Sequence, residues 1–160
     1  MDFKIKKPKK LLASLLIVFS LVAIASWVTS TSVNGWYLSI NKPVLTPPSW
    51  VFPVAWTILY FLMALALYLV WSKGTETKGV KSALVAFGIQ LGLNILWTPL
   101  FFGLNNILLA LIDIYFLLIA IVITIVLFHK VSKKAAYLLI PYLVWVTFAI
   151  YLTQTIFLIN

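Results

Sequence analysis

Cysteine, histidine and acidic residues are the scarce residues of this chain. Its 160 residues include no cysteine, one histidine and three acids. The missing cysteines exclude disulfide bonds and cysteine-ligated metals. With so few carboxylates, the sequence has no paired acids and no Ser–His–acid set, and we expect no metal site and no required cofactor. The single histidine, His129, stands beside Lys130 at the end of an apolar segment, where a histidine is more often solvated than a ligand.

Charge of any kind is also rare, because 64% of the residues are hydrophobic and only 9% are charged. A soluble domain has about 45–50% apolar and about 25% charged residues. The composition therefore indicates an integral membrane protein with no appended soluble module. Nucleic-acid binding is not expected in spite of the net charge of +9, because no soluble domain is present to carry a basic patch.

Five apolar segments are each long enough to cross a bilayer, which takes roughly 20 residues. Backbone groups in hydrocarbon must find partners within their own segment, so such spans are helices. We predict an all-α membrane protein with one domain over residues 1–160, built as a bundle of five transmembrane helices. The predicted spans are about 11–31, 50–71, 82–102, 107–129 and 136–159. An odd number of spans and the lack of an internal repeat argue against an inverted-repeat transporter.

The basic residues predict the orientation of these spans. All twelve are lysines, and eleven of them lie before the first span or in the loops that follow the second and fourth spans. Only Lys42 lies on the other side. Because cytoplasmic loops carry the excess of basic residues, we expect a cytoplasmic N-terminus in the cell membrane and an external first loop.

The first apolar segment has a second interpretation. A basic stretch precedes it, and a small-x-small pattern at Ala23–Ala25 resembles a signal-peptide cleavage site. The apolar run continues through Val28, which is long enough to span a membrane. We favour a retained first span, and cleavage remains an alternative.

The first loop, "NKPVLTPPSWVFPVAW", contains four prolines and two tryptophans between residues 41 and 56. Proline fixes φ, removes a donor and favours extended geometry in the residue before it. The loop is therefore neither continuous helix nor floppy chain. We expect a stiff flap that leads into the second span.

The third predicted span carries a polar and aromatic stripe. Gln90, Asn94, Trp97 and Phe101 recur at the spacing of one helix face. Amides within a bilayer need partners, so this face should point to the bundle interior or to a ligand. Hydrogen bonding between helices explains the two amides as well as ligand binding does.

Gly88 and Gly92 form a GxxxG pair that points to nearly the opposite side of this helix. Small residues at this spacing allow two helix backbones to approach closely. We predict that these two glycines form the contact surface of a homodimer.

Aromatic residues recur on single faces of the fifth and second spans as well. Trp145 lies in the middle of its span, which is not where interfacial anchoring places tryptophan. These residues predict either the lining of a pocket or plain core packing. They are Pro141, Trp145, Ala149 and Thr153 in the fifth span and Pro53, Trp56 and Tyr60 in the second.

Asp113, the only acid within a span, needs a partner or a proton, which allows either a structural hydrogen bond or a proton relay.

Three segments together resemble a known family. "WYLSINKPVLTPPSWVFPVAWTILYFLMA", "QLGLNILWTPLFFG" and "PYLVWVTFAIYLTQTIFLIN" look like the signature blocks of the TspO/translocator-protein family, also called tryptophan-rich sensory proteins or peripheral-type benzodiazepine receptors. The blocks occur in the expected order, and the resemblance covers residues 36 to 160.

The resemblance implies a five-helix bundle, usually a homodimer, with a pocket beneath the first loop for porphyrins, haem or other flat hydrophobic ligands. It places the pocket at Tyr37, Trp56, Asn94, Trp97, Trp145 and Ala149, with Pro47 and Trp50 in the lid. Helical spacing adds Gln90 and Phe101, which share the stripe of Asn94 and Trp97. The expected function is a tetrapyrrole-binding sensor or receptor in contact with membrane lipid. An enzyme that degrades porphyrin with light and oxygen through Trp56 and Trp145, or a porphyrin transporter, are the alternatives.

The chain departs from the family pattern at three places. Thr153 stands where an asparagine is common, and Ala64 stands where a glycine is common. No basic residue follows Tyr151, so the basic end of the animal proteins' sterol motif is missing. Sterol transport is accordingly not expected.

Overall fold

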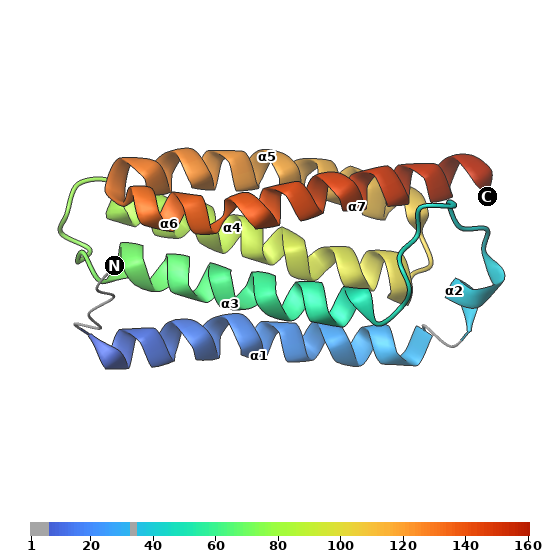
Figure 1. Cartoon of the computed structure of the whole chain (residues 1–160), viewed down its shortest axis with the longest axis horizontal. Helices are drawn as coiled ribbons and strands as arrows, with labels where there is room; N and C mark the ends of the chain where they lie inside the picture. Colours follow the sequence, from blue (N-terminus) through green and yellow to red (C-terminus); the bar gives the residue numbers. More distant parts are fainter. Residues whose placement is uncertain (1–6, 33–34) are drawn as a thin grey trace.

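The computed structural model describes residues 7–32 and 35–160, which form long helices lying side by side (Figure 1). No strand occurs among these residues. The elements in chain order are α1 (Pro8–Ser32), α2 (Trp36–Ser39), α3 (Val51–Trp71), α4 (Val80–Thr98), the π-helix η1 (Pro99–Gly103), α5 (Ile107–Val131), α6 (Lys133–Leu138) and α7 (Ile140–Ile159).

Four stretches of the described chain are long and apolar enough to cross a membrane. They are Val51–Trp71, Val80–Gly103, Ile107–Val131 and Lys133–Ile159. These stretches correspond to the second to fifth predicted spans and confirm an all-helical, multi-pass membrane protein. The first predicted span lies within α1, a helix of 25 residues. Most side chains from 21 to 32, including part of the possible cleavage site, are outside the described ones. That the first predicted span crosses the membrane therefore stays a prediction.

Two of the predicted spans are less regular than their sequences indicate. The third span ends in η1, where the Leu104 amide donates to the Pro99 carbonyl at 2.8 Å. Wider turns of this kind are rare and occur frequently at functional sites. The fifth span is interrupted at Leu139, between α6 and α7. Pro141 then lies in the first turn of α7, where its missing N–H costs no helical hydrogen bond.

The core runs along the middle of the bundle, between α3, α4, α5 and α7. Tyr142, Phe128 and Met63 are among its largest fully buried side chains. Phe128 of α5 stacks on Phe87 of α4 with ring centroids 5.7 Å apart. The polar residues of the core are few, and Asn94, Asp113 and Thr153 among them lie in the half of the bundle toward α2.

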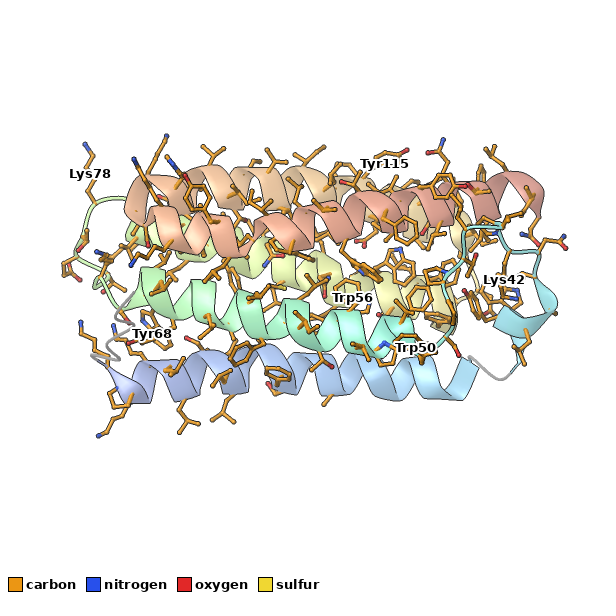
Figure 2. The ribbon with its side chains drawn as sticks, in the orientation of Figure 1. Lys42, Trp50, Trp56, Tyr68, Lys78 and Tyr115 are labelled. Atoms are coloured by element: carbon orange, nitrogen blue, oxygen red, sulfur yellow. The ribbon has the colours of Figure 1, made fainter. Side chains whose placement is uncertain are left out.

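The two ends of the bundle differ in charge. Lys78 lies at one end, with the α3–α4 connection, and Lys42 lies at the other, near α2 (Figure 2). At the Lys78 end, Lys7 and Lys10 donate to the carbonyls of Ser72 and Trp71 at 2.8 and 2.9 Å. Cations near the last carbonyls of a helix are favourable, so these lysines stabilise the end of α3.

Candidate functional site: aromatic clusters beneath the first loop

An amide and two phenols form a hydrogen-bonded group between α3, α4 and α7. The Tyr60 hydroxyl donates to Oδ1 of Asn94 at 2.9 Å. Nδ2 of Asn94 donates to the Tyr142 hydroxyl at 3.0 Å. All three side chains are buried. Asn94 therefore acts as a bridge between helices, which is the structural role that its sequence position left open.

Trp56 covers this group from the loop side. Its ring stacks on Tyr60 with centroids 5.1 Å apart and meets Tyr142 edge-on at 6.3 Å. Figure 2 shows Trp56 on α3 in the middle part of the bundle. Trp145 of α7 meets Phe52, in the first turn of α3, at 6.1 Å. We call these five aromatic residues together with Asn94 the inner cluster.

A second group of rings, the outer cluster, lies where α4 passes into η1. Trp97 stacks on Phe101 with centroids 4.8 Å apart and planes inclined by 13°. Phe101 is almost fully buried, because three further rings pack edge-on against it. They are Trp36 at 5.4 Å, Tyr37 at 6.1 Å and Phe102 at 4.9 Å. Trp97 also packs against the central core, which includes Tyr60 and Tyr142 of the inner cluster.

Several buried polar atoms near these rings lack partners in the described part of the chain. They are both amide atoms of Gln90, Nε1 of Trp97 and Oδ2 of Asp113. Gln90 lies one turn before Asn94 on α4 and is only 1% exposed. A buried polar group without a hydrogen bond costs free energy, which a bound ligand or water with suitable polar atoms recovers.

The first loop approaches the outer cluster through Lys42 and Tyr37. The Lys42 ammonium lies 4.8 Å from the centre of the Tyr37 ring and donates to the Ile40 carbonyl at 3.1 Å. Burial raises the pKa of the Tyr37 phenol above its usual value of 10.0, so the phenol stays neutral at physiological pH. Pro47 is half-buried, whereas the Trp50 side chain is 66% exposed. The structure therefore does not bring Trp50 into either cluster.

The loop is joined to the end of α7 by two asparagines. The backbone N–H of Asn41 donates to Oδ1 of Asn160 at 2.9 Å, and Nδ2 of Asn160 donates to the backbone carbonyl of Asn41 at 3.1 Å. We expect Asn160→Ala to raise hydrogen exchange over residues 41–50 about tenfold, because two bonds of roughly 0.5–1.5 kcal/mol each are lost. The matched control is Gln154→Ala, which removes an exposed amide of α7 that bonds to Tyr115 instead. Equal exchange in both variants would show that the pair does not hold the loop.

The TspO/MBR family model matches residues 13–159 of the chain. The chain belongs to the TspO/MBR family. It is 46% identical to the Tryptophan-rich protein TspO of Archaeoglobus fulgidus over 151 residues, which are 94% of this chain and 97% of that protein. It is 40% identical to the Tryptophan-rich sensory protein of Cereibacter sphaeroides over 116 residues, 72% and 71% of the two chains. The human Translocator protein is 37% identical over 131 residues, 79% and 78% of the two chains.

Some residues of the site in this TspO/MBR protein were missed by the sequence analysis. Tyr142 follows Pro141 in the third signature block and lies three residues before Trp145. The two residues therefore share a helix face, and this spacing could have indicated that Tyr142 belongs to the site. Phe102 and Trp36 gave no such signal. Phe102 follows Phe101 directly, and its ring packs edge-on against Phe101 within the π-helix η1.

Two residues that distinguish this TspO/MBR protein from the family pattern pack without difficulty. The Thr153 hydroxyl donates to the Ala149 carbonyl of its own helix at 2.9 Å, so it needs no partner on another helix. Ala64 is fully buried within the core of the bundle. Ala149 is partly buried beside that core and one turn from Trp145.

Gly88 and Gly92 of this TspO/MBR protein lie on the outer face of α4. A Cβ atom added at either glycine would meet no atom within 4 Å. Val85 and Ile89 of the same helix are also exposed, at 61% and 57%. This face is thus free of contacts in the described chain, and the predicted dimer surface stays a prediction.

Proposed function

We infer that this chain is a TspO-type sensor or receptor that binds a tetrapyrrole, such as protoporphyrin IX or haem, between the aromatic clusters beneath the first loop. The proposal is supported by two neighbouring features. The bundle holds two clusters of aromatic rings, and Gln90 and Trp97 have buried polar atoms without partners among the described residues.

A tetrapyrrole fits this chemistry. The macrocycle is a large flat π-system, and aromatic faces and edges are its favourable neighbours. Gln90 and Trp97 offer donors to its polar atoms, which would satisfy groups that are otherwise buried without bonds. Lys42 provides a cation beside Tyr37 for a propionate. The rings now pack against one another, so binding requires that some of them separate.

We propose that the chain crosses the cytoplasmic membrane five times. α1 supplies one crossing in addition to the four apolar stretches named above, and the lysine-rich end of the bundle faces the cytoplasm. The first loop and α2 then face outward. In this orientation a ligand reaches the clusters from the external side, or laterally from the lipid.

Titration with protoporphyrin IX tests the proposal. In the dark, protoporphyrin IX should quench the tryptophan fluorescence of the purified chain, and the quenching should saturate. Under light, the absorption spectrum of the bound porphyrin should stay unchanged. No quenching would contradict tetrapyrrole binding. Net porphyrin flux into liposomes that contain the protein would indicate a transporter instead.

The contact of Trp56 with Tyr60 favours a second candidate function, the oxidative degradation of the bound porphyrin. An excited porphyrin can accept an electron from a neighbouring indole, and dioxygen would serve as the final oxidant. The Trp56→Phe/Trp145→Phe double variant should keep binding within about threefold, because both rings remain aromatic. It should lose the light-dependent decay of the porphyrin bands, measured by absorbance. Decay at the wild-type rate would exclude the two tryptophans as electron donors.

The outer face of α4 is the proposed dimer surface. Replacing both Gly88 and Gly92 with leucine is expected to convert dimers to monomers, because the helix backbones can no longer approach closely. Sedimentation in detergent measures the change. Ile119→Phe, which adds bulk on the exposed face of α5, is the control. Dimers that survive in the double variant would place the interface elsewhere.

A further inference from the structure

A groove on the outside of the bundle lies near the end of α5, where α6 and the start of α7 face it. Its volume is about 250 Å³. It lies at the opposite end of the bundle from α2 (Figure 1), and none of its lining residues belongs to the aromatic clusters. The residues that line it are Ile125, Val126, His129 and Lys130 of α5, Ala136 and Tyr137 of α6, and Ile140 of α7.

The lining changes from apolar to polar along the bundle axis. Val126 and Ile140 lie one helical turn deeper than Lys130 and Tyr137, respectively, and are 50% and 41% exposed. At the outer edge, the rings of His129 and Tyr137 meet at 6.3 Å. The groove thus has an apolar floor toward the middle of the bundle and a polar rim at its end.

The lysine that lines this groove and two lysines close to it in the chain are free to bind an anion. The ammonium groups of Lys130, Lys133 and Lys134 make no hydrogen bond or ion pair with other described residues, and all three side chains are exposed. Lys7 and Lys10 at the same end differ, because their ammonium groups are already engaged at the end of α3. One unengaged lysine, Lys130, therefore lines a groove with an apolar floor, and two more follow within four residues of it in the chain.

We propose that this groove is a binding site for an anionic phospholipid. One acyl chain lies against Val126 and Ile140, and the phosphate lies at the rim beside Lys130, with Tyr137 and His129 as further hydrogen-bonding groups. Basic pockets between transmembrane helices at the cytoplasmic surface bind acidic head groups in this way. The site is separate from the aromatic clusters, so it does not depend on tetrapyrrole binding.

Charge and shape both favour a lipid over a free anion. A free phosphate would use the lysines but leave the exposed apolar floor in contact with water or detergent. A phospholipid buries that floor and meets the cations at the same time. A zwitterionic lipid buries the same floor, but its own positive charge offsets the attraction to the lysines.

Native mass spectrometry of the purified full chain in detergent tests the proposal. The chain is titrated with phosphatidylglycerol, with phosphatidylcholine of the same acyl chains and with inorganic phosphate. We expect one phosphatidylglycerol per chain to bind at least about fivefold more tightly than phosphatidylcholine, and phosphate not to compete at millimolar concentration.

Two pairs of variants separate the groove from general attraction to the surface. Lys130→Gln/Lys133→Gln/Lys134→Gln should weaken phosphatidylglycerol binding about tenfold or more, since each lysine near the surface contributes severalfold. Lys73→Gln/Lys78→Gln/Lys81→Gln removes the same charge at the same end, from the α3–α4 connection and the first turn of α4, and it should change binding less than about twofold. Val126→Phe fills the groove and should abolish the preferred site. Val85→Phe, at a similar distance from the same end on α4, should not.

Each other outcome would overturn the proposal. Equal losses in the two lysine variants would mean that the head group senses only the overall charge of this end. Competition by phosphate would mean a free-anion site. Equal binding of the two lipids, or unchanged binding in Val126→Phe, would mean ordinary contact with surrounding lipid. Because all the substituted side chains are exposed, melting temperatures close to that of the unaltered chain should verify that the variants fold.

Discussion

Asn94→Leu is expected to lower the free energy of unfolding by about 2–4 kcal/mol. Leucine fills most of the space of the amide but leaves the hydroxyls of Tyr60 and Tyr142 buried without partners. Each unsatisfied buried group costs about 1–3 kcal/mol, although hydrogen bonds between membrane helices average only about 0.6 kcal/mol. Unfolding in detergent with increasing dodecyl sulfate measures the difference.

Two further variants show whether the loss comes from the orphaned phenols. The Tyr60→Phe/Asn94→Leu/Tyr142→Phe triple variant should recover much of the lost stability, because removing all the polar partners together is far less costly than removing one. Gln154→Leu breaks the exposed bond to Tyr115 and should cost less than about 0.5 kcal/mol. A triple variant less stable than Asn94→Leu would contradict this account of the bridge.

Trp97→Ala is expected to have the largest effect on both stability and ligand binding. The indole stacks on Phe101 and packs against the central core, so its removal leaves a cavity between the outer cluster and that core. Large-to-small changes of this kind cost about 3–5 kcal/mol. The affinity for protoporphyrin IX should fall at least about tenfold, because a stacking surface and the Nε1 donor are lost together.

Trp50→Ala is the matched control for this change. The Trp50 side chain is 66% exposed, so its truncation should change the free energy of unfolding by less than about 1 kcal/mol. Fluorescence titration measures binding in both variants, and dodecyl sulfate titration measures stability. If Trp97→Ala binds protoporphyrin as tightly as the unaltered chain, the ligand does not lie against Trp97.

The stripe on the third span shows how far helical periodicity reaches. The spacing of Gln90, Asn94, Trp97 and Phe101 placed these side chains on one side of a helix, and the structure buries the first, second and fourth, with Trp97 partly buried. The period of 3.6 residues is a local property, so it can be read from a single segment. The partners of Asn94, however, come from residues 34 and 48 positions away. Nothing in the segment itself predicts which helix supplies them.

The first loop shows the opposite limit. Its prolines predicted a stiff connection, and stiffness follows from the fixed φ of each proline ring. The position of the loop is decided elsewhere, by Asn160 at the end of α7 and by the packing of α2 on Phe101. Trp50, which the resemblance placed in the lid, is exposed because those contacts do not include it.

Length, apolar composition and lysine placement determined by themselves that this is a multi-pass helical membrane protein, because a bilayer admits few other arrangements of apolar chain. The three signature blocks determined the family. Only the tertiary structure decided that Asn94 bonds to two tyrosines, that Gln90 has no hydrogen-bond partner among the described residues, and that a groove lined by Lys130 forms beside α5. Each of these depends on how helices distant in sequence rotate and pack against one another, and that is settled by the fit of all their side chains together.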